Sequence, residues 1–343
     1  AKLSQEGVEN LIIDLRGNLG GFLNSAYQMA NEFLPKGRLI VYTQGRKSPR
    51  QEYRSDGRGS YQQIPLIVLI DETSASASEI FAGAMQDNDR ATIIGRRSFG
   101  KGLVQQPIPF NDKSMVRLTI ARYYTPSGRC IQKPYTMGDE KSYEEDILVR
   151  YQHGEFFSQD SIKHSGKVYH TSIGRKVYGG GGITPDIFIP EDTLNVTSYY
   201  KEASMSGLIL QFAFTYTDNN RLKLNNFSEM QELADYLVKQ NTVEKFADYA
   251  NKNGLKRRNL MIKKSHKLLE RYINSRIIYN MLNDEAWTEY LNQDDPAIMK
   301  SLDVFKRKAA FPKKGSKNMQ TSMVGMDALP MMNTGKKWVA CFG

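Results

Sequence analysis

The sequence is poor in cysteine and histidine, and it has no long apolar run. Its 343 residues include 2 cysteines, Cys130 and Cys341, which lie far apart and match no metal or redox spacing. The 4 histidines contain no pair four residues apart and no HExxH motif: His153, His164, His170 and His266. These absences argue against a zinc site. The longest apolar run, residues 64–70, has the length of a strand, far below the ~20 residues of a membrane span.

The amino-terminal end also lacks features of a complete chain. Ala1 stands in place of an initiator methionine, and residues 11–15 (LIIDL) already have the composition of a buried strand. We therefore expect a fragment whose upstream part is missing. The absence of a signal peptide then says nothing about the compartment.

The chain carries a formal net charge of +10, and its basic residues concentrate late. They occur in short clusters at residues 256–258, 263–264, 306–308 and 313–314. A nucleic-acid surface is one interpretation. No recognition motif accompanies the clusters, and they lie between apolar positions at helical spacing, so a solvated helix face is favoured and no nucleic-acid partner is expected.

The first half of the chain alternates strand-like and helix-like segments. Strands are predicted at residues 11–15, 41–43, 65–70, 92–94, 115–124 and 187–189, and helices at 23–33 and 76–88. In residues 115–124, Val116, Leu118 and Ile120 alternate with polar residues, which predicts a half-buried strand. Strands that alternate with helices predict an α/β domain with parallel pairing.

The composition then changes twice, which gives a prediction of the domain boundaries. Residues 1–194 form the α/β core, with a polar insertion at about 134–178 that returns to the core at a run of four glycines. Residues 195–311 form a helical domain, in which Asp295 and Pro296 signal a helix start. Residues 312–343 lack periodicity and are predicted to be a disordered tail.

Three segments of the core carry candidate chemistry. Residues 14–21 (DLRGNLGG) place glycines directly after a buried strand, where bare N–H groups can face a developing oxyanion, although an ordinary turn explains them equally well. Residues 74–80 (SASASEI) place serines at a helix start, where the dipole favours negative charge. Ser76 and Glu79 also form a capping-box pattern there. On this segment alone, a helix cap is favoured over a nucleophile, but the two roles are compatible.

The third segment, residues 95–102 (GRRSFGKG), has the GxxxxGK outline of a phosphate-binding loop and makes a nucleotide hydrolase a rival. Gly102 stands where a serine or threonine should reach Mg²⁺, and Pro107 and Pro109 prevent the helix that such a loop needs. Lys101 is either a surface lysine or a buried, neutral base. No histidine lies in the three segments, so a serine paired with a lysine is the candidate variant of the triad.

Together the three segments resemble the carboxyl-terminal processing peptidases, also called tail-specific proteases. The similarity includes residues 11–21, 74–84 and 99–105, with later matches at 122–129 and 181–186, and covers roughly residues 3–192. Lys101 follows Ser76 by 25 residues and Gln105 follows Lys101 by 4, which agrees with the family pattern. The choice of Ser76 over Ser74 and Ser78 rests on this spacing.

The resemblance implies a role for each matching residue. Ser76 would be the nucleophile, Lys101 the general base and Gln105 the residue that orients the lysine. The backbone N–H groups of Gly21 and Ala77 would form the oxyanion hole. The implied fold is an α/β crotonase-like and Clp-protease-like superhelical core, followed here by a mostly helical carboxyl-terminal domain. No cofactor and no metal is implied.

The resemblance also implies a function and a setting. We expect a serine endopeptidase with a Ser–Lys dyad that cleaves proteins or peptides near free, apolar carboxyl termini. We expect a bacterial periplasm or cell envelope as the compartment and a PDZ domain upstream of Ala1. Assembly into a homo-oligomer is left open. Leu19 departs from the family, in which proline is common at this position. A non-catalytic peptide-binding protein on the same fold is the alternative.

Overall fold

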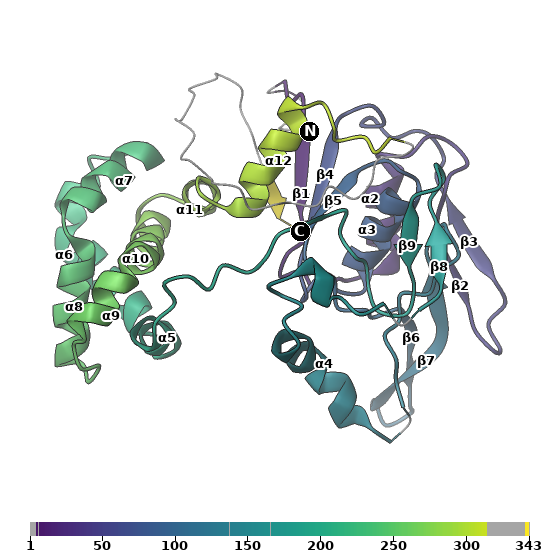
Figure 1. Cartoon of the computed structure of the whole chain (residues 1–343), viewed down its shortest axis with the longest axis horizontal. Helices are drawn as coiled ribbons and strands as arrows, with labels where there is room; N and C mark the ends of the chain where they lie inside the picture. The colour runs from purple at the N-terminus through teal and green to yellow at the C-terminus, as the bar shows by residue number, and fades with distance from the viewer. Residues whose placement is uncertain (1–4, 6, 137, 165, 314–339, 343) are drawn as a thin grey trace. The chain divides into compact units, whose positions relative to one another are not determined.

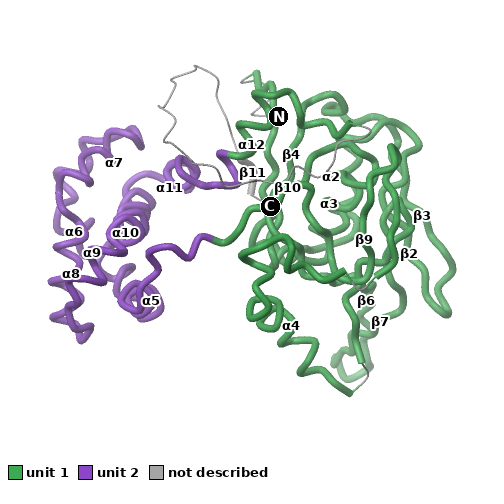
Figure 2. The backbone as a smooth tube through the Cα atoms, in the orientation of Figure 1, with its two compact units in different colours: residues 1–191, 300–343 green, residues 192–299 purple. Residues whose placement is uncertain are grey.

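The chain divides into two compact units. The computed structural model describes residues 5, 7–136, 138–164, 166–313 and 340–342. Residues 1–191 and 300–343 form the first unit, and residues 192–299 form the second (Figure 2). The division near residue 191 lies close to the predicted boundary at 194. The carboxyl end differs from the predicted helical domain of 195–311, because the chain after residue 300 contacts the first unit: Thr92 Oγ1 donates to the Ala310 carbonyl at 2.9 Å.

The first unit is built on a five-stranded sheet with the order β10-β5-β4-β1-β11, in which all pairs are parallel (Figure 1). Its strands are β1 (Leu11–Asp14), β4 (Leu66–Ile70), β5 (Thr92–Gly95), β10 (Ile187–Phe188) and β11 (Ala340–Phe342). Every residue of β1, β4 and β5 is buried, as expected for a parallel sheet covered on both faces. The predicted parallel α/β arrangement is confirmed.

The predicted disordered tail falls largely on residues 314–339 and 343, which lie outside the described residues. Residues 340–342 were included in that prediction. They form β11, which pairs with β1 in parallel register.

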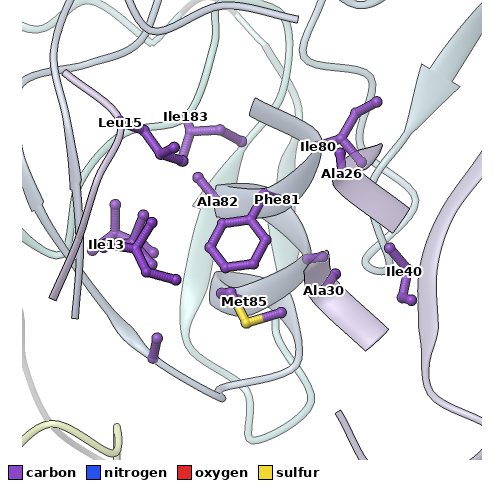
Figure 3. Close-up of a cluster of buried hydrophobic side chains, with 14 of the residues drawn as sticks. Ile13, Leu15, Ala26, Ala30, Ile40, Ile80, Phe81, Ala82, Met85 and Ile183 are labelled. Atoms are coloured by element: carbon purple, nitrogen blue, oxygen red, sulfur yellow. The ribbon is translucent and has the colours of Figure 1, made fainter. Parts of the chain in front are cut away.

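Two helices cover the sheet and pack on each other. They are α2 (Leu23–Asn31) and α3 (Ala77–Asp87). Every residue of α3 is buried, and Figure 3 shows Phe81 and Met85 of α3 among apolar side chains that include Ala30 of α2 and Ile13 of β1. This burial fixes the beginning of α3 at the carboxyl end of β4, where the helix prediction placed Ser76.

A second sheet is antiparallel and has the order β3-β2-β7-β6. Its strands are β2 (Leu39–Gln44), β3 (Gln51–Arg54), β6 (Leu103–Pro109) and β7 (Met115–Tyr124). The prediction that β7 is half-buried along its length is wrong for its first half, because Val116 is 42% and Leu118 is 51% exposed. The reason is topological: β2 pairs only with the last three residues of β7, so the outer part of the β6–β7 hairpin has no second neighbour.

The predicted insertion contains more regular structure than its polar composition suggested. It includes α4 (Glu140–Gln152), a short 3₁₀ helix (Gln159–Ser161), β8 (Val168–His170) and β9 (Lys176–Tyr178). Arg150 of α4 is buried, and its guanidinium donates to the carbonyls of Arg97 and Ser98 at 2.6 and 3.1 Å. Through these hydrogen bonds the insertion stabilises the loop that carries Lys101.

A buried ion pair joins the end of α3 to the segment after β7. Arg129 Nη2 lies 2.8 Å from Asp87 Oδ1, and both side chains are 0% exposed. Replacing Arg129 by methionine leaves the Asp87 carboxylate buried without its cation, which is expected to lower the free energy of unfolding by about 3–5 kcal/mol. Urea unfolding measures the loss. The double variant R129M/D87N should recover part of it, and an unchanged midpoint in the single variant would contradict the prediction.

The second unit is helical, as predicted from residue 198 onward. Its helices are α5 (Ser198–Met205), α6 (Leu208–Leu224), α7 (Met230–Lys239), α8 (Thr242–Lys252), α9 (Asn259–Lys264), α10 (His266–Met281) and α11 (Asp284–Asn292). They share an apolar core that includes Phe212, Leu233, Phe246 and Ile273. The next helix, α12 (Pro296–Lys306), begins at the predicted cap, because Asp295 Oδ1 accepts from the Ala297 and Ile298 amides.

Among the described residues, no helix is both long and apolar enough to traverse a bilayer.

Candidate active site

Ser76 occupies a strained position between β4 and α3. Its φ is 57°, in the left-handed region that non-glycine residues rarely adopt. The side chain is partly exposed although Ala75 and Ala77 on either side are buried. Ser76 Oγ lies 2.9 Å from the Tyr123 hydroxyl. Such strain at the start of a helix is typical of a functional position, because it presents one side chain away from the packed backbone.

The neighbouring serines have structural roles. Ser74 Oγ is buried and donates to the Leu15 carbonyl at 2.7 Å. Ser78 Oγ donates to Asn18 Oδ1 at 2.8 Å. Both hydroxyls thus donate hydrogen bonds to residues at the end of β1 or in the loop after it. Their geometry supports the choice of Ser76 as the candidate nucleophile.

The loop after β1 lies directly against the Ser76 segment, as predicted for an oxyanion hole. The Asn18 carbonyl accepts from the Ala75 N–H at 3.0 Å. Gly20 approaches so closely that an added Cβ would lie 2.6 Å from the Ala77 nitrogen. Within the described residues, the N–H groups of Gly21 and Ala77 donate to no protein acceptor. Ala77 follows Ser76 directly, and Gly21 follows the closely approaching Gly20. Two unused donors at these positions are what the predicted oxyanion hole requires, and their role stays a prediction.

Asp14 and Arg16 hold the beginning of this loop. The Asp14 carboxylate is buried and accepts from Arg16 Nε at 3.0 Å and from Arg16 Nη2 at 2.6 Å. Asp14 Oδ1 also accepts from the Arg16 backbone N–H at 3.0 Å. A two-pronged pair of this kind fixes orientation as well as distance. The Asp14–Arg16 pair therefore fixes the backbone at the point where the glycine-containing loop begins after β1.

A single buried carboxylate connects the serine segment to the lysine loop. Glu79 is fully buried, and its Oε2 accepts from the Ser76 N–H at 2.9 Å and from the Lys101 N–H at 2.8 Å. Its Oε1 accepts from the Gly100 N–H at 2.7 Å and from Ser98 Oγ at 2.5 Å. The predicted capping box is therefore present. The same side chain also brings the backbones of Ser76 and Lys101 to one oxygen atom.

The burial of Glu79 has an electrostatic consequence. Loss of water raises its pKa above the ordinary value, and the hydrogen bond from Ser98 and the three backbone N–H groups act in the opposite direction. Four donors stabilise a carboxylate at this position without a paired cation. The sequence indicated only the cap, since nothing in a capping-box pattern predicts that the glutamate also accepts from a loop some twenty residues later.

The side chain of Lys101 has no hydrogen-bond partner among the described residues, whereas its backbone N–H is bonded to Glu79. The residue is partly buried, and its Nζ makes no hydrogen bond or ion pair within the part of the chain that the structure describes. In particular, no hydrogen bond joins Ser76 Oγ to Lys101 Nζ. The structure thus brings the two backbones together and leaves the proposed proton transfer between the side chains as a prediction.

Gln105 does not show the contact that the resemblance implies. It is exposed on β6, opposite Thr119 of β7 and next to an irregularity in the strand register. Its side chain has no hydrogen-bond partner among the residues described, so its predicted role in orienting Lys101 has no support in this geometry.

Two further residues near Ser76 and the Lys101 loop were missed by reasoning from sequence. Tyr123 supplies the hydroxyl beside Ser76. Lys133 is buried, its N–H donates to the Gly100 carbonyl at 2.9 Å, and its Nζ lies 3.9 Å from the centre of the Phe99 ring. Burial lowers the pKa of Lys133, because the ammonium loses water. Neither residue belongs to a sequence motif or spacing that would predict a role at the site. Tyr123 lies within residues 122–129, which resemble the carboxyl-terminal processing peptidases, but the resemblance implied no role for it.

The loop of residues 95–102 does not have the geometry of a phosphate site. The Gly100 and Lys101 N–H groups, which would face a phosphate, are already bonded to Glu79. The loop continues into strand β6 and not into a helix. The nucleotide-hydrolase alternative is therefore wrong for this segment.

Comparison with protein families matches the α/β part of the chain. Residues 1–142 match the model of peptidase family S41. These residues belong to that family. Residues 199–283 match a second model, described as a family of unknown function, DUF8443. The S41 match contains the Ser76 segment, the Lys101 loop, Tyr123 and Lys133, so the geometry above is that of an S41 domain.

Relatives of the S41 domain are similar over limited lengths. A carboxy-terminal-processing protease of Bartonella bacilliformis is 48% identical over 134 residues, which are 38% of this chain and 30% of the relative. A carboxyl-terminal-processing protease of Synechocystis is 40% identical over 139 residues, 40% and 32% of the two chains. A probable CtpA-like serine protease of Staphylococcus epidermidis is 31% identical over 261 residues, 73% and 47%. The chain thus spans about a third to a half of these relatives.

Proposed function

We propose that the chain carries the catalytic site of a serine endopeptidase that processes carboxyl termini, with Ser76 as nucleophile and Lys101 as general base. The observation that carries the proposal is the shared Glu79 oxygen, which accepts from both the Ser76 and the Lys101 backbone N–H groups and so holds the two segments together. Membership in family S41 and the names of the relatives support the same activity.

The proposed reaction uses groups of the chain alone. The Lys101 amine takes the proton of the Ser76 hydroxyl as Oγ attacks the scissile carbonyl carbon. The N–H groups of Gly21 and Ala77 stabilise the oxyanion of the tetrahedral intermediate. Lys101 then gives its proton to the leaving amine, an acyl-enzyme forms on Ser76, and water hydrolyses it. Helix α3 adds its amino-terminal dipole to the site.

Several finer features are part of the same proposal and rest on the resemblance. We infer protein or peptide substrates with free carboxyl termini, a periplasmic or cell-envelope compartment in a bacterium, and an association with a PDZ domain. The α/β unit is inferred to have a crotonase-like and Clp-protease-like superhelical core, which its parallel sheet and buried α3 support.

A covalent serine probe tests the proposal on the whole chain. A fluorophosphonate is expected to modify Ser76 and to leave Ser74 and Ser78 unmodified, since their hydroxyls are bonded to the loop after β1. Mass spectrometry of the labelled peptide identifies the site. Peptides with a free apolar carboxyl terminus should be cleaved in parallel. A folded protein that takes no label and leaves such peptides intact would contradict the proposal.

The second candidate is a non-catalytic peptide-binding protein on the same fold. The observation in its favour is that Lys101 Nζ does not bond to Ser76 Oγ. Such a protein would bind a carboxyl-terminal peptide in a saturable manner, measurable by fluorescence anisotropy, without cleavage and without labelling of Ser76.

A further inference from the structure

Tyr123 contacts the proposed nucleophile through its side chain. It lies on β7, is 4% exposed, and places its hydroxyl 2.9 Å from Ser76 Oγ. Each of the two hydroxyls can donate to the other. Among the described residues, Tyr123 is the one whose side chain lies within hydrogen-bonding distance of Ser76 Oγ, since the capping-box partner of that oxygen is the Glu79 backbone. The phenol therefore helps to set where the oxygen points.

The backbone of Tyr123 contacts the lysine loop. Its N–H donates to the Gly102 carbonyl at 3.0 Å, one residue beyond Lys101. The Gly102 N–H in turn donates to Gln132 Oε1 at 2.8 Å, a second hydrogen bond at the same residue. One residue therefore connects both halves of the proposed dyad, with its backbone at the lysine loop and its hydroxyl at the serine.

The ionisation of Tyr123 decides what its hydroxyl can do. Burial raises the pKa of Tyr123 to about 12. The phenol therefore keeps its proton at neutral pH and can donate it in a hydrogen bond. When Tyr123 donates to Ser76 Oγ, the proton of Ser76 itself stays free to pass to a base. A buried, neutral donor thus supports the nucleophile without competing for its proton.

We propose that Tyr123 positions Ser76 for attack by donating a hydrogen bond to its Oγ. This inference rests on the proposed protease function and deepens it. Tyr123 keeps its proton throughout: the proton of Ser76 goes to Lys101, the bond from Oγ to the carbonyl carbon forms, and the phenol remains hydrogen-bonded to the same oxygen. The opposite role, a resting-state latch that withholds Ser76 from Lys101, makes the opposite kinetic prediction.

The variant Y123F keeps the ring and removes the hydroxyl. We expect the second-order rate constant for fluorophosphonate labelling of Ser76 and kcat for peptide cleavage to fall roughly 10- to 100-fold, the range for a misplaced reacting group. KM should change little, because the hydroxyl contacts the nucleophile and not the proposed substrate. The thermal midpoint, measured by circular dichroism, should stay close to that of the unmodified chain.

The matched control is Y124F, at the next position of the strand. Tyr124 stacks on Tyr42 with ring centres 4.8 Å apart. Because successive side chains of a strand point to opposite faces, Tyr124 lies on the face of β7 opposite to Tyr123. It should leave labelling and kcat unchanged. Slow labelling of Y123F alone supports the inference. Labelling of Y123F as fast as or faster than the unmodified chain overturns it and leaves the protease assignment standing. No labelling of Ser76 in the unmodified, folded chain overturns both.

Discussion

Replacing Ser76 by alanine, Lys101 by methionine, or both together is expected to lower kcat/KM by about the same factor, roughly three orders of magnitude or more. The reason is that the nucleophile and its base act as a unit, so the second substitution removes little that the first has left. Peptide cleavage by the three variants measures the effect. Methionine keeps the length and apolar stem of Lys101 while removing its amine.

A control and a rival accompany this prediction. K36M alters an exposed lysine and should retain full activity. K133M tests the second lysine at the loop, whose pKa is lowered by burial and whose Nζ donates to the Tyr143 carbonyl at 2.8 Å. It should reduce activity only modestly, because the backbone bond from Lys133 to Gly100 remains. Inactivation by K133M together with an active K101M would reassign the base to Lys133.

Much of the fold could be predicted from the sequence because the parallel sheet is built from local patterns. Residues 65–70 and 92–94 are short apolar runs bounded by turns, and each is a buried strand in the structure. The start of α3 follows from its cap, which depends on Ser76 and Glu79 three residues apart. Such features need only neighbours in the chain, and they place the candidate nucleophile correctly.

The prediction that failed for the fold concerns the burial of a strand face, which depends on what packs against it. The alternation of Val116 and Leu118 with polar residues predicts a strand correctly, but periodicity does not tell whether a covering layer exists. The hairpin of β6 and β7 extends past β2, and its apolar face stays exposed. The pattern fixed the type of element, and the topology decided its burial.

The misses in the site concern contacts between distant segments. Glu79 accepts from residues 98, 100 and 101, and Tyr123 reaches Ser76 across 47 positions of the chain. No local rule predicts such contacts, because they depend on how β5, β6 and β7 place their loops. The resemblance supplied the nucleophile and the lysine, while the carboxylate and phenol that hold them were visible only in the structure.

A close approach of backbone at the Ser76 segment gives the second large prediction. Gly20 has φ of 92°, and an added Cβ would lie 2.4 Å from the Ala75 carbonyl oxygen and 2.8 Å from Ser76 Cβ. Real Cβ atoms do not approach other atoms so closely, and the carbonyl oxygen belongs to backbone that cannot rotate away. G20A must therefore displace the loop, the Ser76 segment, or both. We expect kcat/KM to fall by roughly two orders of magnitude or more.

Gly17 provides the matched control for this effect. Its φ is 71°, so alanine suffers the same left-handed backbone, at a cost of about 1–2 kcal/mol, but its Cβ would meet nothing within 4 Å. G17A should lose stability and keep most of its activity, whereas G20A should lose activity beyond any loss in its thermal midpoint. Equal kinetic losses in the two variants would mean that backbone strain alone explains the result. The difference between them isolates the contact of the loop with Ser76, on which the proposed oxyanion hole depends.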